Sequence, residues 1–192
     1  NAFAAALVLE GDGLAGSAGH FLQRQGQLVN QIAAGLSVAH RQEVVHRDIK
    51  PENVIIQNDE VKLTDFGVAS LMSLLSEGSD YIIGTPAYIS PEQIQGITVD
   101  GRADLYSLGV MLFEMASGGL LPFAERGVTL LYQAHLETAP SSLRELAPEI
   151  PLAFEHIILR LMAKEPEKRY SSAEAALDIL TSIQARQKLS QS

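Results

Sequence analysis

The sequence has 192 residues, with 14 Lys and Arg against 23 Asp and Glu, which gives a formal net charge of −9. This length corresponds to a little over one domain of about 150 residues, and the acidic charge disfavours nucleic acid as a partner. Cysteine is absent, so disulfides, thiolate zinc sites and iron–sulfur clusters are excluded.

The first part of the chain predicts a strand, a polar connection and a helix. Residues 2–9 form an apolar run that is too short to cross a bilayer. No basic residue precedes this run, unlike in a signal peptide, so a buried strand is predicted. Residues 11–27 are rich in Gly, Ser and Gln and predict a connection that contains a short helix at 20–24. A helical stripe then begins at Leu28, with apolar residues at 28, 29, 32, 33, 36 and 39.

The rest of the chain predicts mostly helices. Apolar triplets at 54–56 and 61–63 flank a polar turn and predict a hairpin, whereas 65–92 lack periodicity and predict a long structured loop. Residues 102–117 are apolar on nearly all sides, which predicts a fully buried helix. Three more helices are predicted at 128–137, 152–163 and 171–187, the last with a capping box at 171–174 and a polar tail at 185–192 that frays. The expected fold class is α+β, mainly α-helical, with small β-hairpins.

Three short motifs carry the chemical information. The sequence reads H-R-D-x-x-x-x-N at 46–53, D-F-G at 65–67 and S-P-E at 90–92. At about one in twenty per residue, chance produces the first two motifs at this spacing with odds on the order of one in a million. The sequence therefore resembles the C-terminal lobe of a Ser/Thr protein kinase. The resemblance divides the chain into three parts: the last N-lobe strand with the start of the hinge (1–10), the C-terminal lobe (11–187) and a polar tail (188–192).

The resemblance implies a role for each residue of the site. Asp48 accepts the proton of the attacking hydroxyl, Lys50 contacts the transferring phosphate, and Thr85 joins these two residues. Asn53 and Asp65 supply the oxygen ligands that Mg²⁺ prefers, and the hairpin between them is expected to fold them toward each other. The implied cofactors are ATP and Mg²⁺. The implied function is transfer of the ATP γ-phosphate to Ser or Thr hydroxyls of a protein substrate.

Further residues are implied to support the site without reacting. His46 packs under Phe66 and transfers no proton. Asp104 is the buried carboxylate that fixes the loop backbone, because a buried charge needs hydrogen-bond partners. Glu92 and Arg169 form a buried ion pair, and breaking such a pair costs about 3–5 kcal/mol. The other histidines lack metal-ligand spacing and are interpreted as core or surface residues at 20, 40, 135 and 156.

Nucleotide-binding and regulatory positions follow from the same resemblance. Glu10 corresponds to the first hinge residue, and Ile55 to a residue that stacks under the adenine. Arg47 marks the kinases whose activation loop is phosphorylated, and a phosphate with a charge of about −2 would pair with it. Ser76 and Ser79 are the favoured acceptors, with plain loop residues as an equal interpretation.

The nucleotide-clamping half of a kinase is not recognisable in this sequence. Residues 11–16 spell G-x-G-x-x-G, but a strand lysine should follow, and no lysine precedes Lys50. The Rossmann interpretation also fails, because no acidic residue follows about 20 residues later. We interpret the glycines as a hinge. The N-terminal lobe is expected to be largely missing, and the isolated chain is expected to have negligible activity.

Two other functions compete with a Ser/Thr kinase. A non-catalytic, pseudokinase-like module would dock partners through residues 128–163, and a missing N-terminal lobe favours it. A small-molecule kinase of the aminoglycoside type shares the loop but usually lacks D-F-G, S-P-E and Lys50. No segment reaches membrane length, so the expected location is the cytoplasm, either as a separate protein or as the cytoplasmic domain of a longer, membrane-anchored one. The sequence around the motifs resembles that of bacterial Ser/Thr kinases.

Overall fold

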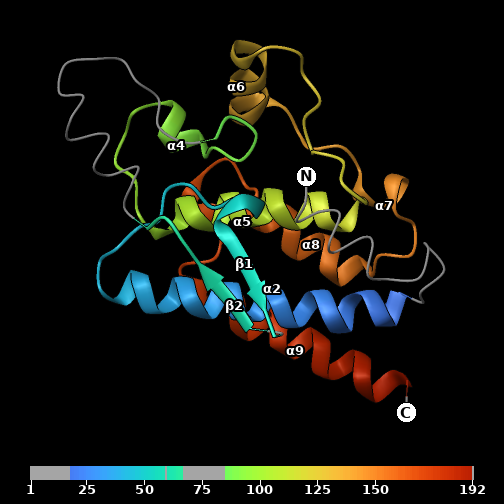
Figure 1. Cartoon of the computed structure of the whole chain (residues 1–192). Coiled ribbons are helices and arrows are strands. Elements are labelled where there is room, and N and C mark those ends of the chain that lie inside the picture. Colours follow the sequence, from blue (N-terminus) through green and yellow to red (C-terminus); the bar gives the residue numbers. More distant parts are fainter. Residues whose placement is uncertain (1–17, 59, 67–84, 192) are drawn as a thin grey trace.

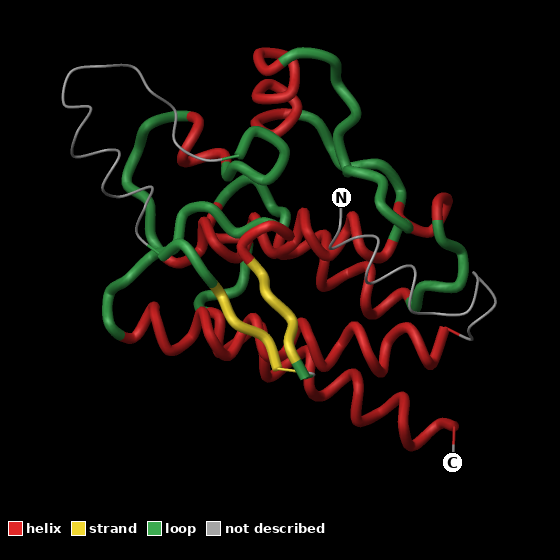
Figure 2. Tube along the Cα trace, viewed as in Figure 1, coloured by secondary structure: helices red, strands yellow, loops and turns green. Residues whose placement is uncertain are grey.

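The computed structural model describes residues 18–58, 60–66 and 85–191. Among these residues, strand occurs only in one two-stranded hairpin, and helices make up most of the rest (Figure 2). The mainly helical α+β prediction is therefore confirmed. In chain order the elements are α2 (Ala18–Arg41), η1 (Pro51–Asn53), β1 (Val54–Gln57), β2 (Glu60–Leu63), α4 (Pro91–Ile94), α5 (Gly101–Ala116), α6 (Val128–Glu137), α7 (Leu143–Leu146), α8 (Leu152–Leu161), η2 (Pro166–Lys168) and α9 (Ala173–Gln191).

Helix α2 is one continuous helix where the sequence predicts a short helix, a connection and a second helix. Gly26 lies inside it, although an interior glycine costs about 1 kcal/mol relative to alanine. Burial of the following stripe offsets this cost, since the core side chains of α2 are less than 8% exposed at Leu28, Val29, Ile32, Ala33 and Leu36. The predicted strand at 2–9 lies outside the described residues.

The hairpin is confirmed, and it packs on α2. Strands β1 and β2 pair antiparallel, with Val54 opposite Leu63, and the Gln31 side chain of α2 accepts a hydrogen bond from the Val61 amide at 2.9 Å. This register places Asn53 beside Thr64, whose amide donates to the Asn53 carbonyl at 3.0 Å. The hairpin therefore carries Asn53 and Asp65 to the same end of the two strands.

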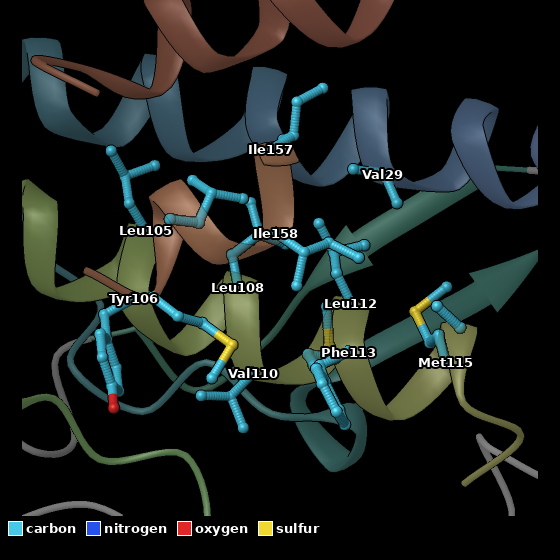
Figure 3. Packing of buried hydrophobic residues seen from close by; sticks show 14 of the residues in the cluster. Val29, Leu105, Tyr106, Leu108, Val110, Leu112, Phe113, Met115, Ile157 and Ile158 are labelled. Atoms are coloured by element: carbon cyan, nitrogen blue, oxygen red, sulfur yellow. The ribbon is translucent and has the colours of Figure 1, made fainter. Parts of the chain in front are cut away.

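Helix α5 forms the centre of the core. Its residues from Ala103 to Ala116 are all buried, as the all-round apolar pattern predicts. Asp100 caps the helix by accepting from the Arg102 amide at 2.8 Å. A Cβ on Gly109 would lie 2.8 Å from side-chain atoms of Leu161 and Met162, so α8 approaches the α5 backbone at this glycine. Figure 3 shows α5 side chains in one cluster with Val29 of α2 and Ile157 and Ile158 of α8.

The remaining helices surround α5. Helices α2 and α9 lie side by side, and α4 and α6 lie on the other side of α5 (Figure 1). Helix α7 is not predicted by the sequence analysis. Helix α9 begins one residue later than the predicted capping box implies, because Ser172 is the residue whose hydroxyl accepts the Ala175 amide, at 3.1 Å. Helix α9 continues through Gln191, four residues beyond the predicted end at 187. None of the described helices is long and apolar enough to cross a membrane.

Candidate active site

The loop of residues 46–50 is attached to helix α5 through one buried carboxylate. Asp104 is fully buried; its Oδ2 accepts from the His46 amide at 2.9 Å and its Oδ1 from the Arg47 amide at 2.8 Å. His40, in the last turn of α2, also donates from Nε2 to Oδ2 at 2.7 Å. Arg47 has a φ of +67°, a left-handed conformation that costs an L-residue about 1–2 kcal/mol. The hydrogen bonds to Asp104 hold the backbone in this conformation directly before Asp48.

Asp48, Lys50 and Thr85 form one hydrogen-bonded group. Oδ1 of Asp48 accepts from the Thr85 hydroxyl at 2.9 Å and from the Thr85 amide at 3.0 Å. The Lys50 ammonium lies 2.6 Å from the other oxygen, Oδ2, and donates to the Thr85 hydroxyl at 2.7 Å. The hydroxyl therefore gives its one hydrogen to Asp48 and accepts one from Lys50. The structure thus brings together three residues whose positions span 37 residues of sequence.

The same contacts set the charge of Asp48. Burial alone would raise the pKa of this carboxyl, but the hydrogen bonds from Lys50 and Thr85 and the Lys50 charge outweigh it, so the pKa lies below its ordinary value. Asp48 is consequently ionised at neutral pH and available as a proton acceptor.

Asn53 and Asp65 flank the hairpin in the sequence and lie at the same end of its two strands. Asn53 donates both hydrogens of its side-chain amide to Asp48, to the carbonyl at 2.8 Å and to Oδ2 at 3.2 Å. These bonds orient the amide, so its oxygen is the atom that could coordinate a metal ion. Asp65 is exposed, has a φ of +63° and accepts from the Thr64 hydroxyl at 3.4 Å. Among the described residues, no group of three or more His, Cys, Asp or Glu side chains could hold a metal ion. An amide oxygen and one carboxylate fit Mg²⁺ that completes its ligands with water and substrate phosphates.

His46 links the loop to the end of the hairpin. Its ring lies 4.5 Å from the Phe66 ring, centroid to centroid, and its Nε2 donates to the Thr64 carbonyl at 2.8 Å. Its Nδ1 accepts from the Asp48 amide at 3.4 Å. Both ring nitrogens therefore contact the backbone, and the ring lies under Phe66 as the resemblance implies.

Side-chain hydrogen bonds attach segment 85–92 and the adjoining Gln93 to the rest of the chain. The Ser107 hydroxyl of α5 donates to the Tyr88 carbonyl at 2.7 Å, and the Tyr88 hydroxyl donates to Glu114 of α5 at 2.7 Å. The Gln93 side chain donates to the Arg47 carbonyl at 2.8 Å, which joins α4 to the loop. Glu92 pairs with Arg169 through two bonds of 2.7 and 2.8 Å. The geometry of the loop and of this segment is thus set by the same helix.

Several predicted site residues either make no contact with the group of Asp48, Lys50 and Thr85 or lie outside the described residues. Ile55, on β1, is 49% exposed and contributes no described contact to Asp48. Glu10, Ser76 and Ser79 lie outside the described residues. Sequence reasoning missed His40, although it continues the buried stripe of α2 four residues after Leu36. It also missed Glu114, although a charged residue within a helix that is predicted to be fully buried needs a partner, and it missed Gln93, which no local pattern distinguishes from a surface residue.

Comparison with known proteins identifies the family of this chain. Residues 18–179 match the model of the protein kinase domain family. The chain is 41% identical over 155 residues to a probable serine/threonine-protein kinase of Clostridium acetobutylicum, which covers 80% of this chain and 23% of that protein. It is 39% identical over 155 residues to the serine/threonine-protein kinase Pkn1 of Myxococcus xanthus, a match that covers 77% of this chain and 22% of that protein. It is 35% identical over 161 residues to the serine/threonine-protein kinase PrkC of Bacillus subtilis, a match that covers 82% of this chain and 25% of that protein.

The chain spans about a quarter of the length of these curated relatives. The match to the family model nevertheless covers most of this chain, and the motifs at 46–53 and 65–67 lie inside it. The chain belongs to the protein serine/threonine kinase family.

Proposed function

We propose that this chain carries the proton acceptor and the metal ligands of a protein serine/threonine kinase, which transfers the γ-phosphate of ATP to Ser or Thr hydroxyls of a protein. The observation that carries the proposal is the hydrogen-bonded group of Asp48, Lys50 and Thr85. A carboxylate that is ionised, half-buried and next to an ammonium suits proton acceptance beside a phosphate.

The mechanism assigns a separate task to each residue. Asp48 accepts the proton as the substrate hydroxyl oxygen bonds to the γ-phosphorus and the bond from that phosphorus to the ADP oxygen breaks. Lys50 faces the charge that develops on the transferring phosphate, and Thr85 holds Asp48 and Lys50 at a fixed distance. Asn53 and Asp65 would hold Mg²⁺, which neutralises phosphate charge when it is bound.

The 192-residue polypeptide by itself is proposed to have negligible activity. Phosphoryl transfer depends on positioning both the nucleotide and the hydroxyl. In the kinase family a strand lysine contacts the nucleotide phosphates, and this sequence has no lysine before Lys50.

The test compares the 192-residue chain with a chimera in which the stretch preceding the matched region of the Bacillus subtilis relative is joined to residue 18 onward. Both are assayed with Mg²⁺ and radiolabelled ATP on unstructured peptides that contain Ser, Thr or Tyr. Transfer to Ser and Thr by the chimera alone is expected, with a loss of about 100- to 10,000-fold in Asp48→Asn. Asp178→Asn, an exposed carboxamide substitution on α9, is the matched control and should keep full activity.

A folded chimera that binds Mg-ATP without transferring phosphate would contradict the kinase proposal. That result would favour the second candidate, a non-catalytic binding module. The observation in its favour is the exposure of large apolar side chains between residues 128 and 163, where Val128, Leu130 and Leu152 are each at least half exposed.

A further inference from the structure

We propose that Lys164 is an acylation site, at which the side-chain amine reacts with small activated acyl donors, namely acyl phosphates or acyl thioesters. Lys164 lies in the connection between α8 and η2 and makes no described contact with the group of Asp48, Lys50 and Thr85. The inference goes beyond the proposed kinase function and does not depend on it.

The amine of Lys164 packs against two aromatic rings and helix α6. Its Nζ lies 4.3 Å from the centroid of the Phe123 ring and 5.9 Å from that of the Tyr106 ring. It donates a hydrogen bond to the Ala134 carbonyl of α6 at 3.0 Å, and the residue is only partly exposed. The one described hydrogen-bond partner of this amine is therefore an uncharged oxygen.

The charges around Lys164 differ from those around other lysines of the chain. Lys50 and Lys168 each pair with a carboxylate at 2.6 Å, whereas the ion pairs of the described residues do not include Lys164. Its charged neighbour is a cation, Arg169, which donates to the Lys164 carbonyl at 3.0 Å and lies 5.0 Å from the centroid of the same Tyr106 ring. No described carboxylate therefore stabilises the ammonium form.

These surroundings make the neutral amine accessible near neutral pH. Aromatic faces attract a cation, but burial and a nearby positive charge act against it. Burial, and next Arg169, lower the pKa of Lys164 from 10.5 to about 8. About a quarter of the amines are consequently neutral at pH 7.5, against roughly one in a thousand for an exposed lysine. Desolvation and a neighbouring cation are the features that activate a lysine as a nucleophile.

The reaction is a transfer of the acyl group to nitrogen. The lone pair of the neutral amine forms a bond to the acyl carbon, the bond from this carbon to the phosphate oxygen breaks, and the surplus amine proton leaves with the phosphate. An acyl thioester reacts in the same way, with a thiol as the leaving group. The acylated nitrogen of Lys164 keeps one hydrogen for the Ala134 carbonyl, so the product is a neutral amide that retains the bond to α6.

Acylation also changes the surroundings of His135, which follows Ala134 on α6. The charge of Lys164 is one of the causes that lower the pKa of His135, and the His135 ring lies near the backbone of Pro86 and Ala87. Removal of that charge should therefore raise the pKa of His135. The modification would thus be felt at segment 85–92 through a single side chain.

The experiment compares lysines within the full 192-residue chain. The chain is treated with acetyl phosphate or, separately, with acetyl coenzyme A at pH 7.5. It is then unfolded and acetylated completely with deuterated acetic anhydride, so that mass spectrometry gives the modified fraction at each lysine. Lys164 is expected to react on the order of tenfold faster than Lys62, an exposed lysine of β2, since the lower nucleophilicity that accompanies a lower pKa offsets part of the gain in neutral amine.

Two further measurements separate the folded environment from other causes. In denaturing urea, Lys164 and Lys62 should react at the same rate. In the folded chain the rate at Lys164 should level off above about pH 8, whereas the rate at Lys62 should rise up to about pH 10. Faster reaction at Lys164 with either donor supports the proposal and identifies the donor class. Equal rates in the folded chain with both donors, an unchanged ratio in urea or parallel pH profiles would overturn the proposal.

An NMR titration of His135 tests the consequence of the modification. Lys164→Gln removes the charge, as acylation does, and should raise the pKa of His135, whereas Lys164→Arg keeps a charge and should leave that pKa at about 4. The chain acetylated at Lys164 should behave like Lys164→Gln. The same His135 pKa in the two variants would refute the connection from Lys164 to segment 85–92.

Discussion

Replacing Glu92 by glutamine is expected to lower the free energy of unfolding by about 3–5 kcal/mol, the cost of removing one partner of a buried ion pair. The substitution keeps the shape of the side chain and removes its charge. It leaves the guanidinium of Arg169 in a site where its side chain has no exposed surface and that of Glu92 has only 3%.

The structure explains why the cost should lie at the high end for an ion pair. Arg169 has five N–H hydrogens, and all five are used. Two go to the oxygens of Glu92, and three go to the carbonyls of Ala163, Lys164 and Arg102 at 2.7, 3.0 and 2.8 Å. The guanidinium therefore cannot move to water when Glu92 loses its charge without breaking the other bonds as well.

Urea unfolding followed by far-ultraviolet circular dichroism measures this cost. The matched control is Glu167→Gln, which removes a carboxylate from the exposed pair that Glu167 forms with Arg102 at 3.3 Å and should cost less than about 1 kcal/mol. The double variant Glu92→Gln with Arg169→Met should lose less stability than the two single changes added together. A cost for Glu92→Gln as small as that of the control, or additive single changes, would refute the reasoning.

Two further predictions concern buried titratable groups. Burial, and next the charge of Lys164, lower the pKa of His135 to about 4 from 6.5. The unfolded chain therefore binds a proton that the folded chain does not, and this contribution to stability is complete above pH 6.5 and is lost as the pH falls to 4, by roughly 3 kcal/mol. The urea midpoint of unfolding should differ more between pH 7.5 and pH 4.5 in the parent chain than in His135→Gln. An equal pH dependence in the two proteins would contradict the role of His135. Burial raises the pKa of Glu114, and the Tyr88 hydroxyl opposes that rise. Tyr88→Phe should therefore cost about 1–3 kcal/mol at pH 8 and less at pH 4, where Glu114 is protonated, whereas an equal cost at both pH values would count against the role of this hydrogen bond.

The elements that the sequence predicts correctly are those with a strong local pattern. The all-round apolar stretch that becomes α5 and the two triplets that become the hairpin need no tertiary information. The sequence predicts helix α2 in pieces, because a glycine and polar residues weaken the helical pattern of its first half, whereas burial from Leu28 to Leu36 stabilises its second half. The short α7 was missed, since four residues carry no period.

The candidate site shows the same division. The positions of Asp48, Asn53 and Asp65 are readable because motif spacing specifies them. The partners that position them come from distant segments, and the contacts of Asp104 with His40 and of Tyr88 with Glu114 join residues 64 and 26 positions apart. Local residue patterns carry no signal for these two pairings, so their geometry appears only in the folded chain.

The attachments to helix α5 restrict how the length of this helix can vary. The loop of residues 46–50 is attached to it at Asp104, and segment 85–92 is attached at Ser107 and Glu114. Each residue along a helix advances about 1.5 Å and turns by about 100°, so a residue inserted or deleted between 104 and 114 would shift one attachment around the axis relative to the other. Helix α5 can therefore accept substitutions of similar volume but no change in length, and variation in length among relatives should be confined to the connections that follow it.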